Sequence, residues 1–553
     1  MDPFNFADLD FDKAFNILLA RNSIEAEKNF KFFRGDHLQD FDTWTGPQIT
    51  DDEIGAVVKK GIARDFTSKN PTRSGVKRHI RGVLGREPGW IITTRRTLGK
   101  TKNDKGEEVD AEPNADEQKR IKEANEHILQ WWNHCRALLA FREAATNFRV
   151  GGRGPLRLYT PPGRLKKTTD GRTVLPVLKP EEAIKHIFLI APKFEAATVV
   201  TDPETMKKAS IFLYTTTDGK QRIEVSFIDD EGFTVFRVLE QGGATFTARV
   251  IDAAAKVANR FFLGTGKKEN EWRYEMDGKL FVFEMNGEPL ITEQVRQNQS
   301  LVAKGLTMLS HNMDMSGFRE RVYLNAQPPG RKIVIDDPEN PSKKVEAFIG
   351  GILPRGAGSE KWVRGVSYTD TDKDGKKATK VLTPDIFESE PLETKSFEDT
   401  ARIGTVNIYE EMDQLHVTIN GDATATGESR KQARDDYQKS LNETAPEVDY
   451  VGSEVLEGFL ALFSILIGKP GRYADLRVAF KCVIDPGPLS AEDRRLLLEE
   501  RKAKVRSRED HMEQIGINDP DAMKRKIQEE EAEEENAGKS DKPEKEDPPG
   551  GDE

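Results

Sequence analysis

The hydrophobic residues of this chain change their spacing near residue 155, and that change limits the fold more than any other feature. Before it, apolar residues recur every three or four positions, as on one face of a helix, and they predict helices at 11–37, 49–66, 75–85 and 115–151. From 155 to 290, short alternating runs are separated by Asp218-Gly219, Gly242-Gly243, Asp277-Gly278 and Asn286-Gly287, which is typical of hairpins. The sequence therefore predicts an α+β protein with an antiparallel sheet after a helical start.

The second half returns to helical spacing, with one interruption. Residues 291–318 and 394–415 have apolar stripes, the second with Phe397, Ala401, Ile408, Met412 and Leu415 on one face. Between them, residues 328–392 are rich in Pro and Gly and alternate as strands do. Another helix is expected from 427, with a break at Pro446, and helical residues continue to Ile467. A short strand, LRVAFKCVI, and charged helices from Ser490 to about Glu535 follow.

Composition excludes some classes of protein. The 553 residues suffice for two to four domains. The two cysteines, Cys135 and Cys482, provide no disulfide framework and no cysteine-rich zinc site. The most apolar stretch, Phe459 to Ile467, is far shorter than a bilayer span, and the acidic N-terminal segment is unlike a signal peptide. We therefore expect a soluble protein that is made inside the cell and has no membrane partner.

The negative charge is concentrated near residue 553. The net charge of the chain is −11, and the segment from Glu529 to Glu553 contains twelve acidic residues and three lysines, which gives −9. We expect this acidic tail to be disordered. Residues 1–528 then have a net charge of only −2, so charge alone neither requires nor excludes a nucleic-acid partner.

Three local patterns suggest chemistry but lack essential residues. LGKT at 98–101 resembles the end of a phosphate-binding loop, yet Thr94 stands where that motif has glycine. Residues 370–375 match the first half of a calcium loop, but Val381 replaces the required glutamate, so a turn between two strands is the simpler interpretation. His134 and Cys135 lack the other ligands of a zinc site. We expect no enzymatic activity, no cofactor and no bound metal.

A small, flexible, polar loop precedes the helix that begins near residue 427. It consists of Asn420, Gly421, Asp422, Ala423, Thr424, Ala425, Thr426 and Gly427. Arg430, Lys431 and Arg434 follow within about a turn of each other and could face a polyanion, although Asp435 and Asp436 come directly after them. Two further basic segments, 75–86 and 152–167, could contact phosphates or could be solvated surface.

The order of these parts resembles that of the tailed-bacteriophage portal proteins, which form the connector ring between head and tail. The resemblance rests on FFRGDHLQDFDTWTGPQ, NPTRSGVKRHIRGVLGREPGW, GRGPLRLYTPPGRL, TEQVRQNQSLVAKGLTML, GDATATGESRKQARDDYQKSL and the segment from Cys482 to Ile527. It covers about Phe15 to Ile527. Each stretch is weakly diagnostic alone, and their order and spacing carry the resemblance. The acidic extension after Glu529 has no counterpart in it.

The resemblance implies a division of the chain into the parts of a portal subunit. These are a helical wing with an antiparallel sheet (1–290), a first stem helix (291–327), a small α/β clip (328–392), a second stem helix (393–419), a tunnel loop (420–427), a long wing helix with the following strand (428–488), crown helices (489–528) and the disordered tail (529–553). The tunnel loop would lie next to DNA, with Arg430, Lys431 and Arg434 as candidate phosphate contacts.

The resemblance also implies a function without catalysis. Portal subunits form a ring, expected here to have twelve members, at one vertex of the capsid in the virion. Double-stranded DNA passes through the ring during packaging and ejection. The expected protein partners are the large terminase subunit, the major capsid and scaffold proteins, and a head-completion or neck adaptor. Two alternatives stay open: a head or tail scaffold or adaptor that never contacts DNA, and a packaging ATPase or nuclease.

Overall fold

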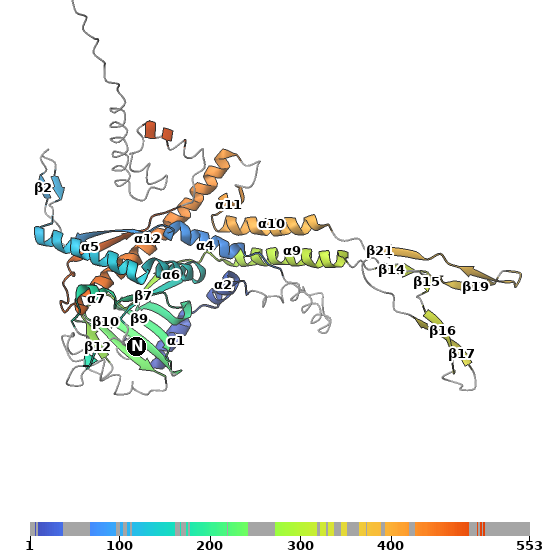
Figure 1. The fold of residues 1–553 in the computed structure, drawn as a ribbon, viewed down its shortest axis with the longest axis horizontal. Helices are drawn as coiled ribbons and strands as arrows, with labels where there is room; N and C mark the ends of the chain where they lie inside the picture. Colours follow the sequence, from blue (N-terminus) through green and yellow to red (C-terminus); the bar gives the residue numbers. More distant parts are fainter. Residues whose placement is uncertain are drawn as a thin grey trace, which may run out of the picture.

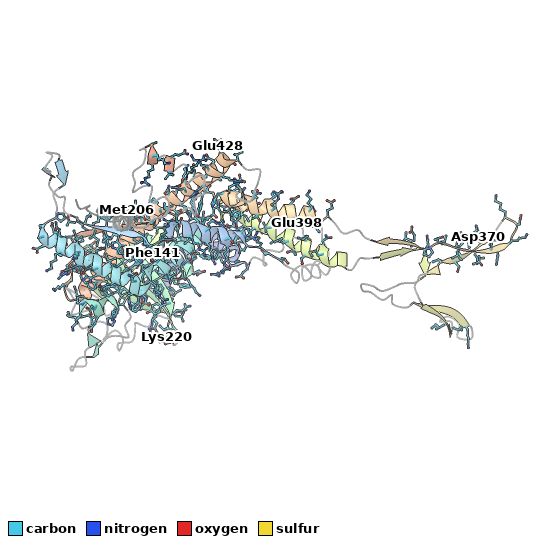
Figure 2. The ribbon with its side chains drawn as sticks, turned by 45° about the horizontal axis from the view of Figure 1, so that its top comes forward. Phe141, Met206, Lys220, Asp370, Glu398 and Glu428 are labelled. Carbon is cyan, nitrogen blue, oxygen red and sulfur yellow. The ribbon has the colours of Figure 1, made fainter. Side chains whose placement is uncertain are left out.

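The computed structural model has an elongated shape, in which a pair of helices connects a broad body to hairpins at the far end (Figure 1). Figure 2 shows Glu398 on this helix pair and Asp370 among the distant hairpins. The fold combines helices with antiparallel sheets, as the sequence predicts. The structure describes residues 6, 9–36, 67–95, 100–102, 108–110, 113–160, 166–167, 173–174, 177–217, 219–241, 271–317, 321–327, 330–336, 344–350, 364–371, 373–388, 393–419, 426–485, 495, 498–499 and 501–503.

The helices of the body begin where the sequence provides capping residues. The Asp10 carboxylate accepts a hydrogen bond from Lys13 N at 2.8 Å, and Asn70 caps its helix with Pro71 at the first position. Asn114 and Glu117 form a capping box. The helices of this part are α1 (Phe11–Arg21), α2 (Ile24–Arg34), α4 (Pro71–Leu84), α5 (Ala115–Cys135), α6 (Ala137–Gly151) and the short α7 (Pro180–Ile184).

The prediction of a single helix over 115–151 is wrong, because the chain forms two helices that meet at Arg136. This residue has φ 52° and ψ 48°, the left-handed conformation, and so it ends α5 and starts α6 in a new direction. The turn lets both helices bury aromatic residues: Trp131, Trp132 and Phe141 are each at most 3% exposed. No glycine or proline marks this position, so packing of the two apolar faces decides it.

A five-stranded antiparallel sheet forms one side of the body. Its order is β12-β11-β10-β9-β8, and α1 covers one face, with Phe11 and Ala14 packed in a cluster with Ile211, Ile223 and Val225. The strands are β8 (Ala197–Thr201), β9 (Lys208–Thr215), β10 (Gln221–Ile228), β11 (Thr234–Glu240) and β12 (Glu271–Tyr274). The short 3-10 helix η4 (Phe194–Ala196) precedes β8.

A second antiparallel sheet joins strands that are distant in sequence. Its order is β13-β4-β7, with β4 (Arg153–Tyr159), β7 (Phe188–Ile190) and β13 (Val282–Asn286). The four predicted hairpin turns therefore have different outcomes. Gly219 turns β9 into β10 as expected, but Asp277-Gly278 connects two different sheets, and Asn286-Gly287 leads out of β13 toward a helix. Gly242-Gly243 lies outside the described residues.

The longest of the described helices, α12 (Gly427–Leu466), packs against α4, α5, α7 and β13 of the body. The prediction that this helix breaks at Pro446 is wrong. Pro446 is exposed, so the carbonyl that loses its N–H donor can be hydrated, and burial of Leu441, Ala445 and Val448 holds the helix on both sides. Residues 459–466 are buried all round, and the Phe459 ring stacks on Trp131 with centroids 4.3 Å apart. The apolar stretch of the sequence is thus a core helix.

Short strand pairs complete the body. β22 (Leu476–Lys481), which follows α12, pairs with β1 (Gly89–Thr94), so Trp90 lies opposite Phe480. The remaining pairs are β2 (Lys100–Lys102) with β3 (Glu108–Asp110) and β5 (Lys166–Lys167) with β6 (Thr173–Val174).

The helix pair between the body and the distant hairpins consists of α9 (Glu293–Gly317) and α10 (Thr394–Glu411), which lie side by side (Figure 1) and are called the stem below. Glycines let their backbones come close: a Cβ on Gly305 would lie 3.1 Å from Phe397 O, and one on Gly404 would lie 2.8 Å from Val302 Cγ2. Both helices are shorter than the stem segments expected from the sequence. After α10, the chain turns through Gln414 into the short α11 (His416–Ile419).

The distant module consists of two-stranded antiparallel pairs. They are β14 (Arg321–Leu324) with β21 (Asp385–Glu388), β15 (Ala326–Gln327) with β18 (Arg364–Gly365), β16 (Gly330–Asp336) with β17 (Lys344–Gly350) and β19 (Ser367–Thr371) with β20 (Lys377–Val381). Its first strand precedes the expected start at 328. The helical part implied by an α/β clip is not found in the described residues of this module.

Three expected regions fall mainly or wholly outside the described residues. The helix expected at 49–66 lies wholly outside them. Only six positions between 495 and 503 represent the expected crown at 489–528, and the acidic tail at 529–553 is not among the described residues. Among the residues that the structure does describe, no helix is both long enough and apolar enough to cross a membrane.

The close contact between α9 and α10 gives a stability prediction. Gly404→Leu should lower the free energy of unfolding by about 1–3 kcal/mol, because the added side chain must displace Val302. Ile403→Leu is the matched control: Ile403 is 48% exposed, so the change should stay within about 0.5 kcal/mol. Urea-induced unfolding measures both variants, and equal midpoints would show that the two helices are not packed this closely.

Candidate functional site

The loop at 420–427 connects two segments that are both fixed to the body. Residues 420–425, which include Asn420, Gly421, Asp422, Ala423, Thr424 and Ala425, lie outside the described residues. Thr426 and Gly427 are described and begin α12. The site is therefore defined by what holds the two ends of the loop.

The first anchor is the turn between α10 and α11, which is held by α4. Gln414 is fully buried, its Nε2 donates to Gly75 O at 2.9 Å, and its Oε1 accepts from Arg78 Nη1 at 3.2 Å. A Cβ on Gly75 would lie only 2.5 Å from Met412 Sδ, so glycine is required for this close approach. The end of α10 is thus pressed against the backbone of α4.

The second anchor is the first part of α12. Thr426 Oγ1 accepts from Ser429 N at 3.2 Å and caps the helix. Tyr437 and Leu441, both at most 1% exposed, pack against Gly82 of α4, where a Cβ would lie 2.7 Å from Leu441 Cδ1. The Tyr437 hydroxyl donates to Arg78 O at 3.0 Å. The same helix, α4, therefore holds both ends of the loop.

The three cations expected near DNA lie on the first turns of α12. Arg430 and Lys431 are exposed, and Arg434 is half-buried. Glu428 precedes them and is labelled in Figure 2, and Asp435 and Asp436 follow, both exposed. The structure thus brings the three cations together on one short segment, but with carboxylates beside them. Such a mixed surface favours weak contact with phosphates.

Two histidines lie between α4, α11 and α12, of which His79 is buried and His416 is half-buried. The His416 ring is 4.6 Å from the Tyr437 ring, and burial, aided by the charges of Arg78 and Arg434, lowers the pKa of His416 to about 4. His79 Nε2 lies 2.9 Å from Thr444 Oγ1, and burial lowers the pKa of His79 to about 3. Both rings are neutral at pH 7, so the anchor region packs without added charge.

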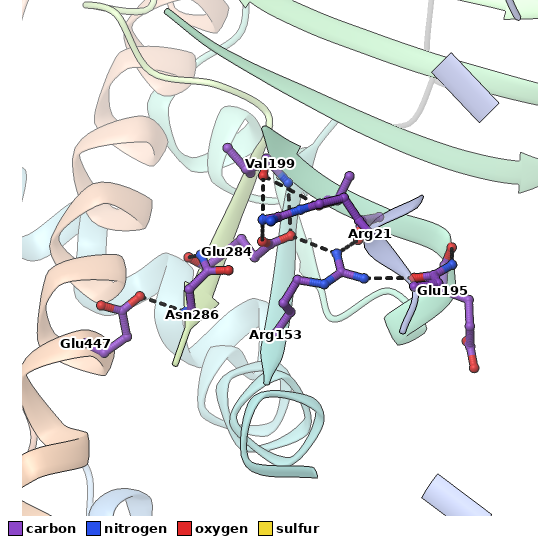
Figure 3. Close-up of polar contacts among 10 residues, drawn as sticks. Arg21, Arg153, Glu195, Val199, Glu284, Asn286 and Glu447 are labelled. Carbon is purple, nitrogen blue, oxygen red and sulfur yellow. Dashed lines mark hydrogen bonds and ion pairs between the residues drawn. The ribbon is translucent and has the colours of Figure 1, made fainter. Parts of the chain in front are cut away.

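Arg153 and Arg157 of the basic segment 152–167 form ion pairs inside the body. Figure 3 shows Arg153 and Arg21 converging on Glu284, and the Arg153 Nη1–Glu284 Oε2 distance is 3.3 Å. Arg157 forms a bidentate pair with Glu224, with a shortest N–O distance of 2.7 Å. These two arginines hold strands together, so they are not exposed phosphate contacts.

The enzyme-like patterns take ordinary structural roles. Lys100 begins β2, whereas the lysine of a phosphate-binding loop lies at the start of a helix. Residues 370–375 join β19 to β20, which confirms the turn between strands, and Lys380 Nζ pairs with Asp370 Oδ2 at 2.7 Å across it. No group of metal-ligating side chains occurs among the described residues.

The structure adds one polar feature that the sequence patterns miss. An open groove at the foot of the stem is lined by amides and carboxylates of both helices, including Glu293, Asn298, Asn407 and Glu411. Glu411 Oε1 accepts from Thr292 Oγ1 at 3.1 Å, and Asn407 Nδ2 donates to Asn298 Oδ1 at 3.3 Å. Most of its polar side chains are already paired, and its lining contains no histidine, cysteine, serine or lysine. The residues that line the groove come together only through the tertiary contact of α9 with α10, so sequence patterns do not reveal it.

Comparison with models of known protein families gave no match for this chain, and a search of curated proteins gave no significant match. The resemblance to portal proteins therefore stays a prediction, which rests on the order of the quoted stretches.

The low pKa of His416 gives a prediction for pH dependence. Between pH 6.5 and about 4 the unfolded chain binds a proton at this histidine and the folded chain does not, so stability falls as the pH falls through this range. His416→Phe keeps a ring against Tyr437 and removes the titration. From pH 7 to pH 5 the variant should lose less unfolding free energy than the wild type, by on the order of 1 kcal/mol. Denaturant unfolding at both pH values measures this, and identical losses would contradict the burial of His416.

Proposed function

We propose that this chain is the subunit of a portal ring, the conduit for double-stranded DNA at one vertex of a phage capsid. One observation carries the proposal: a body is followed by a stem helix, a hairpin module, a second stem helix, a short loop and a long core helix. This is the order that the resemblance to portal proteins implies. In this assignment α9 and α10 form the stem, the hairpins form the clip, and the loop at 420–427 faces the channel.

The hairpin module supports assembly into a ring because none of its described hydrophobic side chains is buried. Val334 and Val381 are 63% and 65% exposed, and each strand of the module pairs with one neighbour only among the described residues. Isolated two-stranded sheets are marginally stable in water, and open strand edges attract further strands. Neighbouring copies around a ring would cover these edges and apolar residues.

The apolar stripe of α10 does not support the ring by itself. Ala401 and Ile408 are buried, and Ala401 lies under Gly305 of α9 in the same chain. The stripe is therefore covered within one chain and does not require a neighbouring copy, so the support for assembly comes from the hairpin module.

The loop and the stem suit a conduit better than the alternatives. A loop of small residues held at both ends can follow a moving duplex, whereas cations on the loop itself would bind phosphates and slow sliding. A scaffold or adaptor that never contacts DNA would not need such a loop. A packaging ATPase or nuclease would need a nucleotide or metal site, and no observation favours one. The hairpin end would then dock the large terminase subunit and later the neck adaptor, and the body would contact the capsid.

The exposed hairpin residues predict an assembly that can be weakened selectively. The purified protein should sediment as a particle of about 750 kDa, twelve times the 62.2 kDa of one chain. Replacing Val334 and Val381 with Asp should shift it toward monomer, because charges would enter the interface. Replacing Ile91 and Met206 with Asp, which are 67% and 71% exposed on the body, is the matched control and should leave the particle intact. A wild-type protein that sediments as monomer at every concentration and salt would contradict the proposal.

The loop composition predicts how translocation depends on salt. Replacing Ala423 and Ala425 with Lys adds two cations per subunit, so packaging by a reconstituted motor should slow most at low salt, where phosphate contacts are strongest. Replacing both with Ser is the control and should leave packaging rates unchanged. Packaging that is equally fast in the Lys variant at every salt, with intact particles, would remove the loop from the path of DNA.

A further inference from the structure

Helix α4 belongs to a stretch of the chain that contains cations and no acids. Residues 66–86 include six Lys or Arg residues and no Asp or Glu, although the whole chain has a net charge of −11. Two of the six have partners elsewhere: Arg86 Nε lies 3.0 Å from Asp485 Oδ2, and Arg78 binds Gln414. The other four, Lys69, Arg73, Lys77 and Arg81, are exposed, and we refer to them as the α4 basic face.

The side chains of the α4 basic face have no acidic partner within the part of the chain that the structure describes. Arg73 lies 5.9 Å from the centre of the Phe33 ring, and none of the four forms an ion pair there. In the other basic segment, 152–167, Arg153 and Arg157 are paired with the glutamates Glu284 and Glu224. Among the side chains of the two basic segments that the structure describes, only those of α4 include exposed cations without an ion pair.

This arrangement is unfavourable for an isolated helix. Arg73, Lys77 and Arg81 are four residues apart, so like charges are neighbours on one face and repel each other. Arg73 also lies in the first turn, where the helix dipole disfavours cations. By contrast α1, α2, α5 and α12 each have an acidic residue in the first turn. A polyanion on this face would remove the repulsion, which solvent alone only screens.

The α4 basic face adjoins the anchors of the loop. α4 lies at the foot of the stem and contacts α9, α10 and α12 (Figure 1). Arg78 of α4 and Arg434 of α12 both lower the pKa of His416, so α4 and the first turns of α12 meet near this residue. Arg430 and Lys431 are exposed one turn earlier on α12.

We infer that the α4 basic face binds the phosphate backbone of double-stranded DNA. Its three helical cations rise by about 6 Å per step and span about 12 Å of helix axis. A DNA strand presents a phosphate roughly every 3.4 Å along its axis, so the face can neutralise several phosphates of one strand without contacting bases. The contact is independent of base sequence, as a conduit for any genome segment requires. The inference rests on the proposed function, which supplies DNA as the polyanion.

A second copy of the chain is the competing partner. The groove with Glu293 and Glu411 could meet the α4 basic face of a neighbour, but those carboxylates already accept hydrogen bonds from Gln297 and Thr292. Two carboxylates also match the row of cations less well than a regular series of phosphates does. DNA is therefore the partner that the charges favour.

The test compares DNA binding by variants with the same change of charge. Arg73, Lys77 and Arg81 are replaced together with Gln, and the control replaces Lys119, Lys122 and Lys193, which are exposed on the body, with Gln. Fluorescence anisotropy with a labelled duplex of mixed sequence measures affinity between about 50 mM and about 200 mM salt. The α4 variant should bind about tenfold more weakly at low salt. Its log–log salt slope should become shallower by roughly 0.9 for each phosphate that the variant no longer neutralises. The control should match the wild type, and R73K/R81K should retain most of the affinity.

Sedimentation and circular dichroism of the same samples separate the other outcomes. Unchanged DNA affinity in a folded α4 variant overturns the inference while leaving the ring proposal intact. An α4 variant whose particles dissociate but whose DNA affinity per chain is unchanged assigns the face to a neighbouring copy and also overturns it. If the wild type forms no particle, the proposed function fails. The comparison of DNA affinities still decides the role of the α4 basic face.

Discussion

The close packing of α4 against the end of α10 and the start of α12 is the contact on which the rest of the structure depends. Gly75 lets Met412 and Gln414 reach the α4 backbone, and Gly82 does the same for Tyr437 and Leu441. Larger residues at either glycine would separate the helices. Through this contact one helix of the body sets the direction of the stem and fixes both ends of the loop.

The charged residues of the chain divide by burial. Inside the body, Arg153 and Glu284 are both buried, and burial raises the pKa of the Glu284 carboxyl while Arg153 opposes this. Removing either partner would leave an uncompensated buried charge, which is strongly destabilising. These pairs connect α1, β4, β8 and β13 and give the body its rigidity (Figure 3). The surface cations of α4 have no such role, which is why the two basic segments must be interpreted differently.

Hydrophobic periodicity predicted much of the fold, because it records which face of each element is buried. It found α4, α9 and α10 and the change to antiparallel sheet. It missed the division of the helix expected at 11–37, which is split at Asn22 and Ser23 into α1 and α2. It also missed the division at Arg136 and the continuity of α12 through Pro446, because tertiary packing decides both against local preference. Pairing of β4 with β13 joins residues more than a hundred positions apart, and no local signal encodes it.

The candidate site, like the fold, could be predicted only in part from the sequence. The composition of residues 420–427 marked a flexible loop, and local spacing marked the cations of α12. The sequence did not reveal that α4 holds both ends of the loop, because Gln414 and Tyr437 reach it across more than three hundred residues. The sequence also did not show which basic segment is paired inside the body and which is exposed. The carboxylates that pair with Arg153 and Arg157 lie far along the chain.

Electron microscopy of the purified full-length protein in negative stain tests the central claim most directly. We expect rings with a central hole wide enough for a DNA duplex, with the bodies outside and the stems gathered around the hole. Single elongated particles, or compact oligomers with no hole at concentrations where the chain associates, would contradict it.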